Sequence, residues 1–292
     1  MRLLMMLTTV AVAVAGTATS ATAGDFRRDG KLVLTDGITS VEGAAGGGIA
    51  AWATIAGNET DAGIGATGHA TTVRLPDFDL EAYGVAVGIH DRVELSYTRQ
   101  SFDTRAAGAA LGLGRRFTFA QDIWGAKVRL FGDAIWDQHT VLPQVAVGVQ
   151  HKRATRGAVI RAVGGADKDG TDFYVSATKL LMARAMILDA TVRLTGANQF
   201  GLLGHGGDKG QGRTAQFEGS VAVMLSPRFA LGAEVRTKPD RLGFAREDDA
   251  YDVFAAWAVH RHVTLTAAYA DLGDIATVNN QRGVFLQLQG GF

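Results

Sequence analysis

The chain is 292 residues long, and its 29 lysines and arginines balance its 29 aspartates and glutamates at pH 7. A protein that binds nucleic acid is expected to carry a basic excess, so this balance argues against nucleic-acid binding. The absence of cysteine excludes disulfide bonds and thiolate metal sites. Glycine is abundant at 38 residues and proline scarce at 4, which is typical of many strands and turns rather than of a linker.

The N-terminal residues resemble a secretory signal peptide. Arg2 supplies a positive charge, residues 3–16 form a short apolar stretch, and residues 21–23 read Ala-Thr-Ala, an A-x-A cleavage site. An uncleaved membrane anchor is disfavoured because the apolar run is too short to span a bilayer. We therefore predict that residues 1–23 are a signal peptide and that residues 24–292 form one exported outer-membrane domain. No later stretch approaches about 18 uninterrupted apolar residues, which excludes a helical membrane protein.

The exported part contains segments in which apolar and polar side chains alternate, so that each strand has one apolar and one polar face. In chain order these segments lie near residues 31–41, 48–57, 62–73, 83–89, 93–98, 124–130, 145–149, 171–181, 186–194, 217–225, 229–235, 250–259, 263–269 and 284–292. The total of about 14 strands (12–14) predicts an all-β fold, a transmembrane up-and-down antiparallel β-barrel. The first three segments are rich in glycine, and residues 24–47 are either an N-terminal strand or a plug in the lumen.

The connections between these segments alternate in length along the chain. Short turns lie near residues 89–91, 181–184, 226–227 and 259–262, and long connections near 103–121, 153–170, 196–215 and 239–249. Outer-membrane barrels show this alternation because their periplasmic turns are short and their extracellular loops long. A soluble β-sandwich explains the alternating side chains but gives no reason for the alternating loops. The connection near 132–141 departs from the pattern, being long in a short position.

The last segment has a distinctive end. Leu286, Leu288 and Phe292 share the apolar face, and the chain stops at the phenylalanine. This segment resembles the terminal strand through which bacterial outer-membrane proteins engage the barrel assembly machinery. We therefore expect that machinery, outer-membrane lipid and lipopolysaccharide as partners, and the bacterial outer membrane as the location.

Charged residues gather on the polar face of the strands. An arginine or lysine that faces lipid at the membrane midplane costs roughly 2–4 kcal/mol, so we predict that this face lines the lumen. The predicted lumen charges are Glu94, Lys127, Arg129, Asp189, Arg193, Glu218, Glu234, Arg236 and Asp252. They form either a salt-bridge network that stabilises the wall or a selectivity constriction like the charged rings of pores. Many other inward positions are glycine or alanine, which leaves space in the lumen.

Two further patterns invite a metal or an enzyme interpretation. Asp167, Asp169 and Asp172 resemble the start of a calcium loop, but without the distal glutamate and helical flanks a hairpin turn is favoured. The G-x-S-x-G motif of many hydrolases is absent, and most histidines fall at turns or loops. His69 is the histidine that the alternation can place in the lumen. We predict no cofactor, no metal and no enzymatic activity.

Several stretches resemble an uncharacterised family of proteobacterial outer-membrane proteins of unknown function, DUF 3034. They are VEGAAGGG (41–48), YGVAVGIHDRVELSYTRQSFDT (83–104), ALGLG (110–114), GAKVRLFGDA (125–134), DFYVSATK (172–179), ANQFGLLG (197–204), FEGSVA (217–222), GAEVRTKPD (232–240) and REDDAYD (246–252). The resemblance covers nearly all of the exported chain. It implies the barrel and the location, and it implies no activity and no catalytic residue.

Three functions fit these patterns. The favoured one is a narrow, porin-like channel or uptake barrel that transports a small solute. The second is a structural or surface-interaction barrel with a closed lumen, whose long loops bind a partner or lipopolysaccharide. The third is a barrel hydrolase that acts on lipid or peptide, in which His69 would take part.

Overall fold

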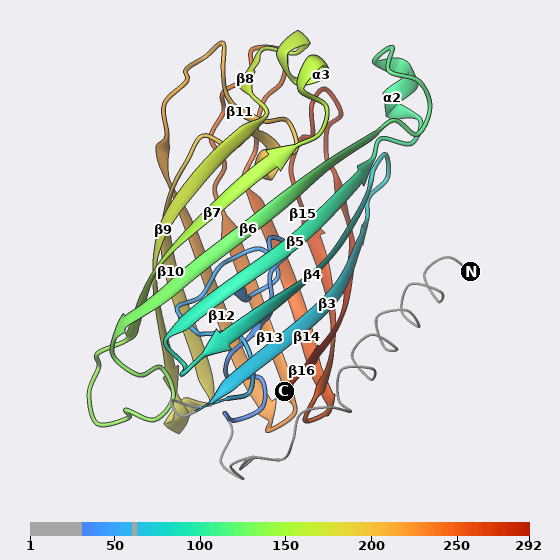
Figure 1. Cartoon of the computed structure of the whole chain (residues 1–292). Coiled ribbons are helices and arrows are strands. Elements are labelled where there is room, and N and C mark those ends of the chain that lie inside the picture. Colours follow the sequence, from blue (N-terminus) through green and yellow to red (C-terminus); the bar gives the residue numbers. More distant parts are fainter. Residues whose placement is uncertain (1–30, 60–62) are drawn as a thin grey trace.

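The computed structural model describes residues 31–59 and 63–292 and shows a closed antiparallel barrel of twelve strands (Figure 1). The barrel strands are β3 (Ile64–Arg74), β4 (Asp79–Ile89), β5 (Val93–Asp103), β6 (Thr118–Phe131), β7 (Gln144–Ala154), β9 (Asp169–Leu181), β10 (Met186–Thr195), β12 (Thr214–Ser226), β13 (Phe229–Arg236), β14 (Ala250–His260), β15 (Val263–Asp271) and β16 (Arg282–Gly291). Each pairs with its neighbours in the chain, and β16 pairs with β3 to close the barrel. The predicted signal peptide, residues 1–23, lies outside the described residues.

The remaining elements are short and lie in the connections or inside the barrel. They are β1 (Ile38–Thr39), β2 (Ala45–Gly46), β8 (Gly165–Asp167), β11 (His205–Gly207), the helices α2 (Ala107–Ala110) and α3 (Gly157–Ala162), and the 3-10 helices η2 (Met182–Arg184) and η3 (Asn198–Gly201). None of the helices in the described ranges is long and apolar enough to cross a membrane.

The alternation of side chains along each strand separates two environments. In β10 the side chains of Asp189, Thr191 and Arg193 are buried in the barrel, whereas Leu188 and Val192 are exposed on its outside. This arrangement is the reverse of a soluble protein, in which apolar side chains are buried. It is the arrangement expected when the outside faces lipid and the inside faces a polar lumen.

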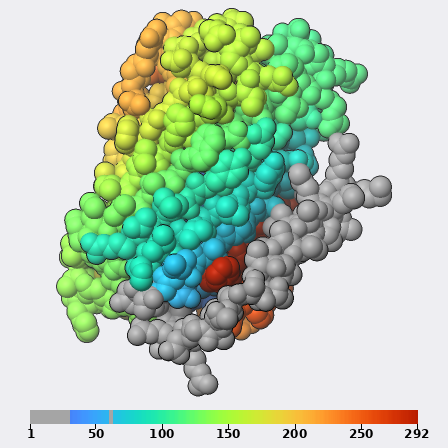
Figure 2. Space-filling model, in the orientation of Figure 1, coloured from blue at the N-terminus to red at the C-terminus, as the bar shows by residue number. Residues whose placement is uncertain are grey.

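An apolar outer surface runs around the whole barrel. Figure 2 shows the strands as a continuous wall on the face in view, with the long connections above it. The exposed side chains on the strands include Tyr83, Val85, Leu95, Trp124, Val175, Val192, Val253, Trp257, Tyr269 and Leu286. A band of this kind is too large for a water-soluble monomer and fits a lipid environment.

The two ends of the barrel differ, as the connection lengths predict. The short-turn end carries the connections 90–92, 132–143, 182–185, 227–228 and 261–262. The loop end carries the connections 75–78, 104–117, 155–168, 196–213, 237–249 and 272–281, most of them long (Figure 1). The start of β3 and the end of β16 both lie at the short-turn end. The unexpectedly long connection 132–143 also lies there.

The predicted count of about 14 strands is wrong, and the structure has the lower number of the predicted range. The segments near 31–41 and 48–57 are not barrel strands. Instead, residues 31–58 fold back inside the barrel, where only the two-residue strands β1 and β2 pair with each other (Figure 1). We call residues 31–58 the plug. Its glycines allow tight turns, and its backbone bonds to wall side chains in place of a continuous strand ladder.

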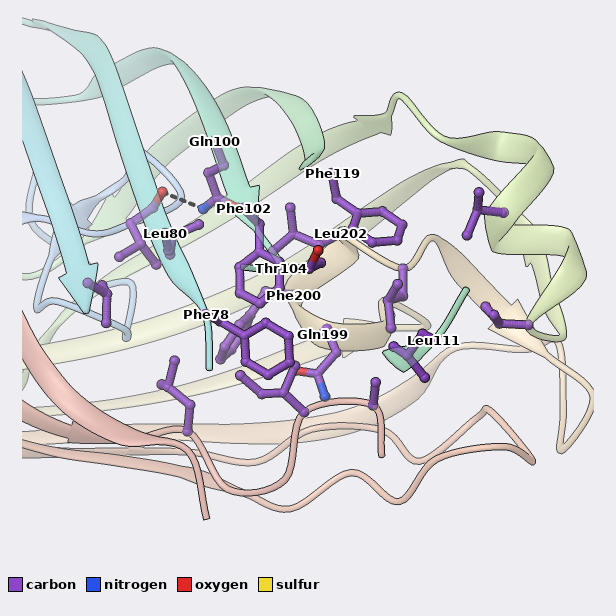
Figure 3. A pocket seen from close by; sticks show the side chains of 18 of the residues that line it. Phe78, Leu80, Gln100, Phe102, Thr104, Leu111, Phe119, Gln199, Phe200 and Leu202 are labelled. Atoms are coloured by element: carbon purple, nitrogen blue, oxygen red, sulfur yellow. Dashed lines mark hydrogen bonds between the residues drawn. The ribbon is translucent and has the colours of Figure 1, made fainter. Parts of the chain in front are cut away.

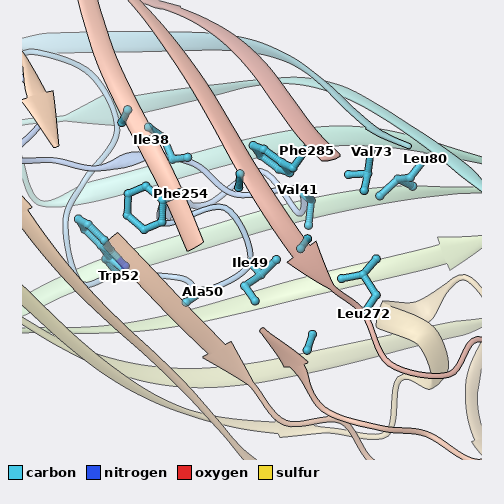
Figure 4. Close-up of a cluster of buried hydrophobic side chains, with 14 of the residues drawn as sticks. Ile38, Val41, Ile49, Ala50, Trp52, Val73, Leu80, Phe254, Leu272 and Phe285 are labelled. Atoms are coloured by element: carbon cyan, nitrogen blue, oxygen red, sulfur yellow. The ribbon is translucent and has the colours of Figure 1, made fainter. Parts of the chain in front are cut away.

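The plug packs closely against the wall. Apolar side chains of the plug, among them Ile38, Ile49 and Trp52, contact Phe254 and other inward residues of the wall (Figure 4). Small residues make this approach possible. A Cβ atom on the wall residue Gly88 would lie 2.0 Å from the carbonyl oxygen of Ala56. The small inward residues that the sequence contains therefore accommodate the plug.

The lipid-facing assignment predicts a cost for charge on the outside. Val175 lies at the centre of β9 and is 50% exposed, so Val175→Arg should destabilise the barrel by roughly 2–4 kcal/mol. Val141 lies in the connection 132–143 and is 97% exposed, so Val141→Arg is the matched control and should change little. Urea titrations of the barrel refolded in lipid vesicles measure both. Equal effects of the two changes would contradict the assignment.

Candidate functional site

The plug enters and leaves the lumen at the short-turn end. At its start, Lys31 Nζ lies 2.8 Å from a carboxylate oxygen of Asp91 in the connection 90–92. At its end, the Asn58 backbone N–H donates to the carbonyl oxygen of Phe292 over 3.1 Å. Residues 34–56 between these points are buried. The predicted plug, 24–47, overlaps this segment from residue 31, and residues 24–30 lie outside the described residues.

The part of the plug around Glu42, which lies toward the loop end, is called its tip. A cluster of six buried charges lies where this tip meets the wall. We call it the lumen charge cluster, and its members are Glu42, Lys152, Asp172, Arg193, Glu218 and Arg236. Five of them come from strands β7, β9, β10, β12 and β13, and Glu42 comes from the plug. Three cations and three carboxylates therefore balance, as buried charges require.

Glu42 joins the plug to the cations of the wall. Its carboxylate lies 3.0 Å from Arg236 Nη2 and forms a second ion pair with Lys152 Nζ. Burial alone would raise the pKa of Glu42, but the positive charges of Arg236, Lys152 and Arg193 lower it to about 2. Glu42 is therefore ionised in the docked plug.

The wall partners form a chain of ion pairs, which Glu42 closes into a ring. Lys152 Nζ lies 2.8 Å from Asp172 Oδ2, and Arg236 Nε lies 3.3 Å from Glu218 Oε1. Arg193 pairs with Glu218 and donates to Gln150 Oε1 over 2.6 Å. Arg193, Glu218 and Arg236, three of the predicted lumen charges, therefore lie together, and the structure adds the plug as their common partner.

Other predicted lumen charges bind the backbone of the plug. Glu94 and Lys127 lie 3.1 Å apart, and the Glu94 carboxylate accepts the backbone N–H of Ala56 over 2.9 Å. Lys127 Nζ donates to the carbonyl oxygen of Thr54 over 2.6 Å. Glu234 accepts the N–H of Ile49 over 2.9 Å. These charges thus replace the strand partners that the plug backbone lacks.

The remaining three predicted lumen charges lie outside the lumen charge cluster. Asp189 is buried and accepts a hydrogen bond from Thr178 Oγ1 over 2.6 Å. Asp252 is buried next to the plug, and a Cβ atom on Gly48 would lie 3.6 Å from its Oδ2. Arg129 lies at the short-turn end of β6 and pairs with Asp91 and with Asp133, the latter over 3.1 Å.

The weak calcium candidates point in different directions. Asp172 faces the lumen and pairs with Lys152, whereas Asp169 pairs with Arg153 over 3.2 Å at a more exposed position. Asp167 lies in β8, which pairs with β11. Within residues 31–59 and 63–292, no group of three or more such side chains is placed to hold a metal ion.

His69 is buried in the lumen wall on β3. Neither of its ring nitrogens has a hydrogen-bond partner in the described part of the chain. No described group therefore orients this imidazole as a general base, which is the feature that nucleophilic catalysis needs.

Glu42 and Lys152 are not among the predicted lumen charges, and Asp172 was predicted to lie in a turn. Lys152 and Asp172 have the parity of inward residues on β7 and β9, so extending both strands by a few residues would have found them. Glu42 offers no such signal. It stands in a glycine-rich stretch, and its role depends on the fold of the plug.

An apolar cavity of about 150 Å³ lies between the tip of the plug and the loop end (Figure 3). Its floor is formed by Val41 and Ile49 of the plug. Phe102 and Phe119 line it from the strands, and the connections of the loop end cover it, with Phe200 among them. The lumen therefore has a charged, plugged part and an apolar part above it.

A family model described as protein of unknown function (DUF3034) matches residues 35–289. The chain belongs to the DUF3034 family. The predicted resemblance is thereby confirmed, and the match includes Glu42 in the plug and every barrel strand except the last two residues of β16. Comparison with curated proteins gives no match.

Solved bacterial barrels share the architecture. The KdgM porin superposes with a TM-score of 0.50 at 6% identity and covers 77% of this chain and 99% of its own. The NanC porin gives 0.49 at 10% identity, with 78% and 98% covered, and outer membrane phospholipase A from Escherichia coli gives 0.43 at 11% identity, with 78% and 92% covered. At such identities the similarity shows the fold alone. This DUF3034 member is thus an antiparallel barrel of the outer-membrane type.

The ionised Glu42 predicts a pH-dependent contribution to plug docking. Its pKa is about 2 when docked and near 4.5 when free, so the stabilisation is complete above pH 4.5 and is lost as the pH falls through 2. Glu42→Gln should favour undocking on the order of a hundred-fold above pH 4.5, and this difference should fall to about ten-fold at pH 3 and vanish below pH 2.

The reactivity of one engineered thiol measures this difference. Ala50 lies fully buried in the plug, so Ala50→Cys reports undocking through its reaction with dithiodipyridine, and the chain has no other cysteine. The thiol reaction rate is compared as a ratio between the Ala50→Cys proteins with and without Glu42→Gln. This ratio removes the effect of Asp36, because burial raises the pKa of Asp36 to about 6 in both proteins. A ratio that does not change with pH would show that Glu42 does not hold the plug.

Proposed function

We propose that the protein is a gated uptake barrel of the bacterial outer membrane for a small solute, with residues 31–58 as the gate. In this proposal the short-turn end faces the periplasm and the loop end faces outside. The apolar outer band, the twelve-strand architecture and the difference between the two ends support the location. Outer-membrane lipid, lipopolysaccharide and the barrel assembly machinery, which would engage the strand ending at Phe292, are the expected partners.

The observation that carries this proposal is that the plug fills the lumen without contributing a strand to the wall. The barrel closes through β3 and β16, whose register runs from Val284↔Arg74 to Gly291↔Thr67. The plug can therefore leave without opening the barrel. A plug that only filled the lumen would not need to be separate from the strands of the wall.

The tip contacts favour a plug that can be displaced. A buried ion pair gains Coulomb energy but loses the hydration of both charges, so its net contribution is much smaller than its Coulomb energy. When the tip leaves, water can enter the lumen and hydrate Glu42, Lys152 and Arg236 again. The cluster thus specifies the docked position while holding it with a modest net free energy.

A second candidate function is a closed structural or surface-interaction barrel whose loops bind a partner. The observation that favours it is the filled lumen itself. We propose transport rather than enzymatic activity, because the buried His69 lacks a described hydrogen-bond partner that would orient it. The two barrel functions differ in whether the plug moves.

A disulfide between plug and wall tests this movement. A Cβ atom on Gly43 would lie 3.8 Å from the Cβ atom of Ser96 on β5, which is the separation that disulfides prefer. We expect the Gly43→Cys, Ser96→Cys protein to show channel openings in a planar bilayer when reduced and none when oxidised. Gly43 has a φ of +94°, and its Cβ atom would press against Thr98 Oγ1, so the Gly43→Cys single variant is the control for backbone strain and for this contact.

Deletion of residues 24–58 completes this test. The barrel closes without them, so the truncated protein should fold and should conduct persistently. Silence of both the truncated and the reduced proteins would contradict gated uptake and would favour the closed barrel.

A further inference from the structure

The apolar cavity offers a ligand few polar groups. Its polar lining side chains are Gln100, Thr104 and Gln199, and each makes a hydrogen bond inside the protein. Gln100 Nε2 donates to the Val41 carbonyl oxygen over 2.6 Å (Figure 3), and Thr104 Oγ1 donates to the Phe117 carbonyl oxygen over 2.8 Å. A charged or sugar-like ligand would lose its hydration here without replacement, whereas an apolar ligand would gain from leaving water.

The size of the cavity also selects its occupant. Protein interiors leave few voids larger than a water molecule, so a space of about 150 Å³ is unusual. A cavity of about this volume lined by leucine, isoleucine and phenylalanine stays dry and binds benzene or xenon. Here Phe78 and Phe102 stack with ring centroids 5.0 Å apart and present aromatic surface to the space (Figure 3).

The backbone around the cavity is held in strained conformations. Gln199, Phe200 and Ala276 line the cavity and have φ values of 45°, 60° and 55°, which residues other than glycine rarely adopt. Such strain persists where the surrounding structure imposes it, and it gathers at ligand clamps. The connections 196–213 and 272–281 are thus shaped around this space rather than collapsed into it.

The cavity adjoins the contacts that hold the plug. Its floor residue Val41 precedes Glu42 in the chain. Its lining residue Phe200 has its ring 4.5 Å from the Arg236 guanidinium, and its carbonyl oxygen accepts from Lys152 Nζ over 3.2 Å. A molecule in the cavity would therefore touch Phe200, which contacts two of the ion-pair partners of Glu42, Arg236 and Lys152.

We propose that the cavity binds a small, uncharged apolar molecule, a hydrocarbon or monocyclic aromatic compound of about the size of benzene. Such molecules are then the solute class of the barrel, a step that rests on the proposed uptake function. Leu111 marks the entrance, because it lines the cavity and remains 39% exposed at the loop end. The solute enters between the loops, occupies the cavity above the plug, and passes when the plug leaves.

Xenon and benzene are the probes that test the binding site. Crystals of the full exported chain under xenon pressure should show an anomalous peak between Phe78, Phe102 and Phe200, and benzene vapour should displace it. Ala270→Leu fills the cavity from β15 and should abolish the peak. Ala267→Leu is the matched control, because Ala267 lies on the same strand but faces outward, and its peak should remain.

If Ala270→Leu does not fold, Val163→Phe fills the cavity from the connection 155–168. A wild-type cavity that contains no xenon, or a peak that both filling variants retain, would overturn the proposal. The binding and transport experiments separate the two claims. Xenon binding without conductance would support the binding site and contradict the uptake function. Conductance without xenon binding would support the uptake function and contradict apolar molecules as its solutes.

Discussion

The need to compensate buried charge organises the lumen of this barrel. The wall carries Lys152, Arg193 and Arg236 at one level, where side chains are almost fully shielded from water. Isolated charges in such a place are strongly unfavourable, so each must have a partner. Asp172 and Glu218 compensate two of the three positive charges from the wall itself. The third requires Glu42, and this requirement fixes where the tip of the plug lies.

The same logic explains why the plug has so little secondary structure. A segment inside a closed barrel cannot join the strand ladder, because every wall strand already has two neighbours. Its N–H and C=O groups therefore need side-chain partners, and Glu94, Lys127 and Glu234 provide them. Charges that look like the lining of a pore thus serve first as hydrogen-bond partners of the plug.

The lumen contains two kinds of chemistry in series. The part around the plug is charged, with ion pairs joining the six members of the lumen charge cluster, and the part beneath the loops is apolar. Phe200 lies on the boundary, with its ring near Arg236 and its side chain lining the cavity. Phe200 thus contacts both the apolar part and one of the cations that hold the plug. The sequence stretch ANQFGLLG, at 197–204, builds this boundary through two left-handed residues, Gln199 and Phe200.

Much of the fold follows from the sequence alone, because strand alternation is a local property. The parity of Val192 and Arg193 assigns them to opposite faces, and the connection lengths assign strand ends to opposite ends of the barrel. The same parity predicts the inward positions of Arg193, Glu218 and Arg236. It could not exclude residues 31–41 and 48–57 as strands, since short alternating runs occur in any glycine-rich segment.

The fold of the plug, its ion pairs and the apolar cavity are visible only in the tertiary structure. Glu42 meets Lys152, Arg236 and Arg193 only because a glycine-rich segment turns back into a closed barrel, and no local pattern encodes that contact. The cavity is likewise built by side chains from many connections and strands, such as Phe78, Phe200 and Phe285, that are distant in the chain. The sequence determines the face to which each wall side chain points. Only packing across the lumen determines which side chains meet there and how much space they leave.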